Sequence, residues 1–273
     1  MSDGEDVTDA GERVSPDTAD FGLLAHLSIY RFARRFAVGK RVLDAGCGTG
    51  YGAHDLAAGG ARSVLAVDAS AKAIAFCQRR YRHPRLLFAQ ADLMALDVAG
   101  PFDLVFCSNV LEHLADPDPF LETVRRRLAP DGVLVMAVPP IRGLGEWFGN
   151  LENPHHVTNL PPELWEMKLD RSFAALAPFA HWVAPHLLGD DGAIRRAAVD
   201  SADQFVFTPE SFTRLAGSLS TISLVVVATR PRAVPRPRTT AEDGMPIAWI
   251  EARIRRDFGR LIAFKRRHTA PAA

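Results

Sequence analysis

The chain has 273 residues, enough for one large α/β domain with additions, and 48% of them are apolar, so a sizeable core can be buried. Its 32 basic and 32 acidic residues cancel, so no overall field favours nucleic acid, a membrane surface or an acidic partner. Three scattered cysteines favour a reducing compartment and the acidic N-terminus lacks the features of a signal peptide, so we expect a cytoplasmic protein.

The pattern along the chain predicts three parts. Residues 1–20 are acidic with few large apolar groups, and we expect them to be disordered. Residues 21–230 form the main domain, in which the glycine-rich and polar stretch 141–205 is interpreted as a lid and acceptor-binding region. Residues 231–273 combine a Pro/Arg linker with a basic amphipathic helix at 247–264.

Strands and helices are predicted to alternate in the main domain. Strand-to-helix alternation of this regularity is typical of a parallel sheet with right-handed crossovers, and ligands of such sheets bind at the carboxyl ends of the strands. Strands are predicted at 42–45, 64–67, 86–89, 104–108, 133–138, 179–184 and 222–229, and helices at 21–36, 53–58, 70–81, 120–128 and 162–173, with a short one beginning near 208.

The most informative stretch follows the first predicted strand, where glycine occupies every second position. Gly46, Gly48 and Gly50 lie at the junction of a strand and a helix, directly after Asp44. Glycine is required where the backbone turns tightly or where a ligand approaches without a Cβ in the way. The spacing G-x-G-x-G differs from the G-x-G-x-x-G of dinucleotide folds, and it predicts a nucleotide-type ligand at this turn.

Two further acids follow predicted strands. Asp68 ends the second strand, where a carboxylate can accept hydrogen bonds from the two hydroxyls of a ribose. Asp92 follows the third strand and suits an acceptor for an adenine amino group. The alternatives are a helix-capping role for Asp68 and an ordinary loop position for Asp92.

In this order and near these spacings, the motifs resemble those of the class I S-adenosylmethionine (SAM) methyltransferases of the type 11/type 12-like group. Residues 102–114 resemble their fourth-strand motif, an aromatic–Asp–apolar strand that runs into Glu-His-Leu. Residues 153–164 resemble an NPxHV…sPEEL pattern of members that serve natural-product or surface-glycan pathways. The resemblance implies a Rossmann-like, doubly wound and mostly parallel sheet of seven strands, with helices on both faces and the last strand antiparallel.

The resemblance also implies SAM as the cofactor and a hydroxyl of a small molecule, rather than an amine or a carbon, as the methyl acceptor. We expect a monomer or a homodimer. The residues expected to bind the cofactor are Tyr30, Asp44, Gly46, Gly48, Gly50, Asp68, Ala69, Asp92, Leu93, Asn109 and His113.

A hydroxyl acceptor needs a base, and histidine has a suitable pKa. His156 on the predicted lid is the favoured candidate and His113 the second, although either can instead be a structural residue that hydrogen-bonds the backbone. No metal site is predicted, because His155 and His156 are adjacent and no Asp or Cys near them completes a ligand set.

Two other functions stay open from the sequence. An NAD(P)-dependent or nucleotide-sugar Rossmann enzyme would need G-x-x-G spacing and usually a Tyr-x-x-x-Lys pair, neither of which is found. A non-catalytic SAM-binding partner or regulatory subunit would keep the glycine loop and lose the catalytic groups.

Overall fold

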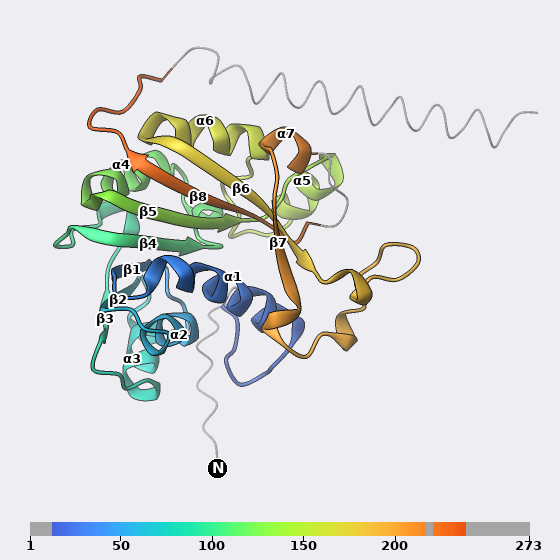
Figure 1. Cartoon of the computed structure of the whole chain (residues 1–273), viewed down its shortest axis with the longest axis horizontal. Helices are drawn as coiled ribbons and strands as arrows, with labels where there is room; N and C mark the ends of the chain where they lie inside the picture. Colours follow the sequence, from blue (N-terminus) through green and yellow to red (C-terminus); the bar gives the residue numbers. More distant parts are fainter. Residues whose placement is uncertain (1–12, 217–220, 239–273) are drawn as a thin grey trace, which may run out of the picture.

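One mixed sheet organises the computed structural model of this chain, which describes residues 13–216 and 221–238 (Figure 1). The predicted helix at 247–264 and the first part of the 1–20 segment lie outside the described residues. Within them the sheet has eight strands in the order β3-β2-β1-β4-β5-β8-β6-β7. The strands are β1 (Arg41–Ala45), β2 (Ser63–Asp68), β3 (Leu86–Gln90), β4 (Phe102–Ser108), β5 (Leu128–Val138), β6 (Phe173–Val183), β7 (Phe205–Pro209) and β8 (Ser223–Pro231).

The first five strands form the parallel part of the sheet. Val42 of β1 lies beside Val64 of β2 and Leu104 of β4, and β5 pairs with β4 in the same direction. Every residue of β4 from Leu104 to Cys107 is fully buried, because helices cover both faces of a parallel sheet. The nearly continuous apolar runs of the sequence thus mark the middle of the sheet.

The remaining strands are antiparallel to their neighbours. β8 pairs with β5 on one side and with β6 on the other, and β7 pairs with β6 at the edge. The predicted doubly wound α/β class and the antiparallel last strand are confirmed. The sheet has one strand more than the seven expected, namely β7. This strand is five residues long and follows a polar insertion, so its only sequence signal is the alternation of Phe205 and Phe207.

Helices form a layer on each face of the sheet (Figure 1). On one face, α1, α2 and α3 pack against Val42, Val64 and Phe106. On the other, α4, α6 and α7 pack against Leu43, Leu134 and their neighbours. The helices are α1 (Phe21–Ala37), α2 (Tyr51–Ala58), α3 (Ala71–Arg80), α4 (Asp118–Arg127), α5 (Leu144–Leu151), α6 (Pro162–Ser172) and α7 (Phe212–Leu215).

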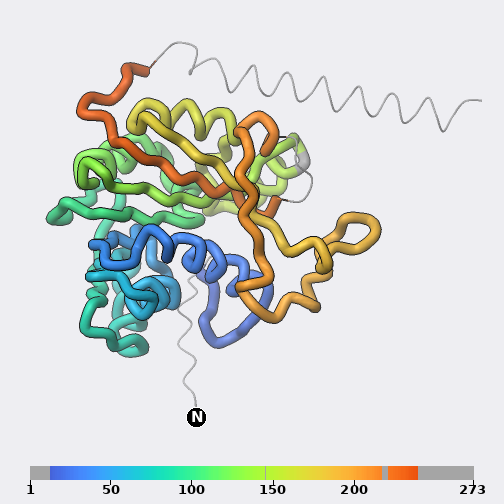
Figure 2. Tube along the Cα trace, viewed as in Figure 1, coloured from blue at the N-terminus to red at the C-terminus, as the bar shows by residue number. Residues whose placement is uncertain are grey.

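Two connections lie outside these layers. The long connection between β6 and β7 projects beside the start of α1 (Figure 2), where Leu187 and Val199 pack against Leu24. The connection from β5 to α6 is the first part of the predicted 141–205 region, is called the lid below, and contains the short helix α5. The next part of that region forms α6 and β6, which belong to the layers of the domain. The lid leaves the carboxyl end of a parallel strand, so it is placed to shape a site there.

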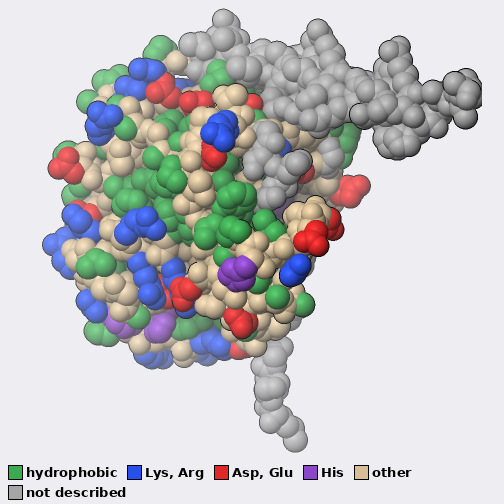
Figure 3. All heavy atoms as spheres, turned by 45° about the vertical axis from the view of Figure 1, so that its right-hand side comes forward, with side chains coloured by type: hydrophobic (Ala, Val, Ile, Leu, Met, Phe, Trp, Pro, Cys, Tyr) green, Lys and Arg blue, Asp and Glu red, His purple; other side chains and the backbone are tan. Residues whose placement is uncertain are grey.

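The surface has no dominant charge in the view of Figure 3, where basic and acidic side chains surround an apolar centre. This matches the formal charge balance of the sequence. Among the described helices, none combines the length and the apolar character needed to cross a bilayer. Cys47, Cys77 and Cys107 are buried free thiols.

Candidate functional site

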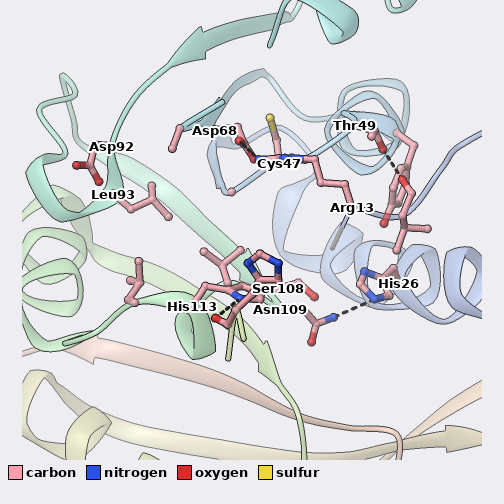
Figure 4. Close-up of a pocket in the computed structure, with 18 of the residues that line it drawn as sticks. Arg13, His26, Cys47, Thr49, Asp68, Asp92, Leu93, Ser108, Asn109 and His113 are labelled. Carbon is pink, nitrogen blue, oxygen red and sulfur yellow. Dashed lines mark hydrogen bonds and ion pairs between the residues drawn. The ribbon is translucent and has the colours of Figure 1, made fainter. Parts of the chain in front are cut away.

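A cleft of about 680 Å³ opens at the carboxyl ends of β1, β2 and β4, where the sequence predicts the ligand (Figure 4). Most of the expected cofactor-binding residues line it. Asp44 and Gly50 do not line the cleft, and neither does His156. The expected residues that line it are Tyr30, Gly46, Gly48, Asp68, Ala69, Asp92, Leu93, Asn109 and His113.

The glycine loop forms the floor of the cleft. Gly46 has a φ of +84°, and a Cβ there would lie 2.4 Å from Cγ2 of Val110, so only glycine fits. Gly48 also has a positive φ, of +53°, but a Cβ there would meet nothing within 4 Å. The loop therefore packs tightly against the protein at Gly46 and leaves room for a ligand at Gly48.

Asp68 holds this loop in place. Its Oδ2 accepts a hydrogen bond from the backbone N–H of Gly48 at 3.0 Å, and its Oδ1 accepts one from Ser70 N at 2.9 Å. The guanidinium of Arg13 also donates to Oδ1 at 3.0 Å. The carboxylate expected to bind a ribose is thus in contact with an arginine of the N-terminal segment (Figure 4).

Asp44 lies beneath the loop rather than in the cleft. Its carboxylate accepts hydrogen bonds from Tyr30 Oη at 3.2 and 3.3 Å, and only 1% of the residue is exposed. The pKa of Asp44 is raised to about 8, chiefly by burial; the Tyr30 hydrogen bond opposes the rise and the nearby Asp68 adds to it. Asp44 therefore bonds to Tyr30, which lines the cleft, and does not face the cleft itself.

Asp92 and Leu93 border another part of the cleft (Figure 4). Oδ1 of Asp92 accepts a hydrogen bond from Met94 N at 2.9 Å, which caps the 3-10 turn Leu93–Ala95. A capping role thus applies to Asp92. Because the residue is also exposed, its carboxylate has room to accept a hydrogen bond from an amino group of a ligand.

The candidate catalytic histidines come together where the lid crosses the end of β4. The rings of His113 and His156 lie with their centroids 5.0 Å apart. Nδ1 of His113 is 2.9 Å from the carbonyl oxygen of His155, and Nδ1 of His156 is 2.7 Å from Oδ1 of Asn150. Because each Nδ1 faces an oxygen acceptor, it carries the ring proton, and the lone pair of each neutral ring is on Nε2.

Several residues of the cleft were not predicted from the sequence. His26 of α1 accepts a hydrogen bond from Nδ2 of Asn109 at 3.2 Å, and burial lowers its pKa to about 4 despite the nearby Asp20. His26 lies four positions before Tyr30, a predicted cofactor-binding residue on the same helix, and this helical spacing could have identified it. No sequence feature pointed to Arg13 as a site residue, because it is the lone base in an acidic stretch. The unpredicted lining residues include Arg13, Val14, His26, Cys47, Thr49 and Ser108.

Comparison with known proteins agrees with this geometry. Residues 42–132, from β1 to the start of β5, match the family described as "Methyltransferase domain". A Mycobacterium tuberculosis protein named "Probable S-adenosylmethionine-dependent methyltransferase" is 32% identical over 199 residues, which is 71% of this chain and 72% of that protein. A ubiquinone biosynthesis O-methyltransferase of a Caulobacter species is 40% identical over 103 residues, 36% of this chain and 40% of its own.

Solved structures share the fold. A SAM-dependent methyltransferase of Mesorhizobium loti has a TM-score of 0.55 at 21% identity, covering 76% of this chain and 98% of its own. One of Archaeoglobus fulgidus has a TM-score of 0.56 at 18% identity, covering 77% of this chain and 94% of its own. With the glycine loop, Asp68 and Asp92 around one cleft, these relationships favour SAM over the NAD(P) alternative. The chain belongs to the class I SAM-dependent methyltransferases, and its cofactor is SAM.

Proposed function

We propose that this methyltransferase transfers the methyl group to a hydroxyl oxygen of a small molecule, an intermediate of a natural-product or glycan pathway. The observation that carries the proposal is the pair of imidazoles, His113 and His156, beside the cofactor cleft. A hydroxyl must lose its proton during the transfer, and neutral imidazole is the side chain suited to take it near neutral pH. An amine that is already neutral when bound needs such a base much less.

The pathway is proposed from the sequence pattern at 153–164 and from the lid. The O-methyltransferase named above supports an oxygen acceptor, although it matches only 36% of this chain. The lid residues Pro154, His155 and Val157 line the same cleft as the glycine loop, so an acceptor held under the lid lies beside the cofactor. The lid is the part of the domain whose sequence is least explained by the cofactor-binding motifs, and we place acceptor specificity there.

The protein's part in the reaction is to orient two molecules and to accept a proton. SAM supplies a methyl group on a positively charged sulfur. Asp68 would hold its ribose hydroxyls in competition with Arg13, and Asp92 would hold the adenine amino group. Orienting the acceptor oxygen in line with the methyl group can supply about 7–11 kcal/mol of the barrier.

The proton is assigned to His156. Its Nδ1–H donates to Oδ1 of Asn150, so the ring is held with Nε2 as the basic nitrogen. His113, the second candidate, is fixed in the same way by the carbonyl oxygen of His155.

A panel of hydroxyl, amine and thiol acceptors with labelled SAM tests the proposal. We expect product only with hydroxyl acceptors, and His156→Ala should lower the rate by roughly 10²–10⁴-fold with SAM affinity nearly kept. His186→Ala is the matched control, because this exposed histidine lies in the connection between β6 and β7 and does not line the cleft. Methylation of amines alone would refute the acceptor class. SAM binding without methylation of any acceptor would favour the non-catalytic alternative.

A further inference from the structure

The two imidazoles have a third neighbour that the mechanism above does not use. Glu112, His113 and His156 each offer one ligand atom, and these atoms all lie within 4.8 Å of one another. The expectation of no metal site rested on the tandem pair His155-His156. The fold instead supplies Glu112 and His113 from the turn after β4, more than 40 positions before His156 in the chain.

The burial of Glu112 is the first argument for a cation. Only 2% of this residue is exposed, although it carries a carboxylate. Carboxylates this deeply buried are paired with other groups or coordinate metal ions, because isolated charge is costly away from water. Two imidazoles and one carboxylate are a ligand set typical of divalent first-row transition metals.

The orientation of the histidines is the second argument. Metal-binding histidines almost always donate their other ring N–H to an oxygen, which fixes the tautomer and the direction of the ring. His113 and His156 both do so, through His155 O at 2.9 Å and Asn150 Oδ1 at 2.7 Å. With Nδ1 protonated, Nε2 is the nitrogen of each ring that carries the lone pair a metal ligand needs.

Hydrogen bonds between the two segments hold the three side chains together. Thr158 N, on the lid, donates to the carbonyl oxygen of Glu112 at 2.9 Å, and the hydroxyl of Thr158 donates to the carbonyl oxygen of Leu114. Ligand atoms bound to one ion at about 2.0–2.2 Å are roughly 3–3.5 Å apart. The three ligand atoms lie within 4.8 Å of one another, so they would move closer together on binding an ion.

We propose that Glu112, His113 and His156 bind one divalent transition-metal ion beside the cofactor cleft. Three protein ligands leave coordination positions open, and two neighbouring positions suit an acceptor with a second oxygen next to the reacting hydroxyl. The substrate class is thus a vicinal diol, a catechol or a hydroxyl beside a carbonyl group. This inference rests on the proposed hydroxyl acceptor and replaces the base role of His156 with a ligand role.

The reaction balances without a further reagent. The ion lowers the pKa of the bound hydroxyl, and its proton passes to water. The oxygen lone pair forms the bond to the methyl carbon, and the electron pair of the breaking carbon–sulfur bond stays on sulfur, which becomes a neutral thioether. His156 holds the ion through Nε2 and takes no proton.

Metal binding by the EDTA-treated full chain is the test, measured by calorimetry with Zn²⁺ and Co²⁺ and by the visible absorption of bound Co²⁺. We expect one ion per chain, with affinity at least 10- to 100-fold weaker in Glu112→Gln, His113→Ala and His156→Ala. His155→Ala is the matched control, since its backbone carbonyl is kept, and its affinity should stay within about 2-fold of wild type. Melting temperature and SAM affinity, measured in parallel, verify that each variant folds.

Three outcomes would overturn the proposal. They are absence of stoichiometric binding in the wild type, an equal loss in the control, and a methyl-transfer rate that EDTA leaves unchanged on the true acceptor. If EDTA has no effect while His156→Ala is inactive, the base role stands and the ion is refuted. Because SAM binding is measured separately without metal, failure of the ion site is distinguishable from failure of the methyltransferase assignment.

Discussion

Replacing Asp68 tests how the cleft recognises its cofactor. In the structure this carboxylate has three donors, namely Gly48 N, Ser70 N and the Arg13 guanidinium. We expect the ribose hydroxyls to compete with Arg13 for this carboxylate, while the two backbone donors stay. Asp68→Ala removes the ribose acceptor and the anchor of the glycine loop together, whereas Asp68→Asn keeps a neutral acceptor.

The magnitude follows from these contacts. A hydrogen bond to a charged group contributes about 1.5–3 kcal/mol. Wild type must also break the Arg13–Asp68 pair, in which 22% and 10% of the side chains are exposed, and a pair of this kind is worth about 0.2–1 kcal/mol. Since Asp68→Ala abolishes both effects, the net loss of SAM affinity should be about 0.5–2.8 kcal/mol, or roughly 2- to 100-fold.

Calorimetry of SAM binding to Asp68→Ala, Arg13→Ala and the double variant measures both the ribose hydrogen bonds to Asp68 and the competition from Arg13. The Arg13 substitution should lose its effect once Asp68 is absent. Asp203→Ala, which breaks an exposed ion pair with Arg31 outside the cleft lining, is the control. Unchanged SAM affinity in a folded Asp68→Ala variant would refute the assignment of the ribose site. Because Gly48 N and Ser70 N lose their acceptor, Asp68→Ala should also melt at a lower temperature, which Asp68→Asn should partly restore.

Four further outcomes are expected. Arg13→Ala alone should raise SAM affinity about 1.5- to 5-fold in the same calorimetric assay, because the ribose no longer competes with an arginine; weaker binding would show that Arg13 helps to hold the cofactor. Deletion of residues 1–19 should change the melting temperature little and should give the same SAM affinity as Arg13→Ala. Asp20 is kept, because its side chain caps α1 by accepting a hydrogen bond from Leu23 N. A large fall in melting temperature would contradict this prediction. Gly46→Ala should cost roughly 1–3 kcal/mol of stability in chemical denaturation, since its φ of +84° and the contact with Val110 both oppose a Cβ, and Val110→Ala should recover part of the loss. The carboxyl of Asp44 has a pKa of about 8 in the folded protein and of 3.8 in an unstructured chain, so between these pH values the folded state retains a proton that the unfolded state loses. The free energy of unfolding should therefore fall as pH rises from about 4 to 8. Asp44→Asn should make the melting temperature less dependent on pH over that range.

Local sequence pattern was enough to predict the parallel half of the sheet. Its strands are apolar runs such as 104–107, bounded by turns. Because Asp68 ends β2, its position at the cleft could be predicted from the strand alone. The glycine loop was predicted for the same reason, because a positive φ at Gly46 is a backbone requirement that a sequence records directly. β7 was missed because it is only five residues long and follows a polar insertion, so the alternation of Phe205 and Phe207 was too short a signal.

Contacts between distant segments account for the remaining differences. Arg13 contacts Asp68 although the two are 55 positions apart in the sequence, and the acidic residues around Arg13 give no indication of that contact. Asp44 was expected in the cleft, but the depth of β1 places it beneath the loop, where Tyr30 binds it. The meeting of Glu112 with His156 depends on how the lid folds back over the turn after β4, which motif spacing does not encode.

The position of β8 between β5 and β6 has a consequence for synthesis. The ribosome makes β6 and β7 before the strand that joins them to the rest of the sheet, so the nascent chain carries two separate half-sheets, each with an unpaired edge. At roughly 5–20 residues per second, the stretch from β5 to β8 takes several seconds to emerge. During that time β5 and β6 both expose backbone donors and acceptors to other chains. Any product truncated before β8 would keep these edges permanently, and we expect it to aggregate rather than to form a smaller version of the domain.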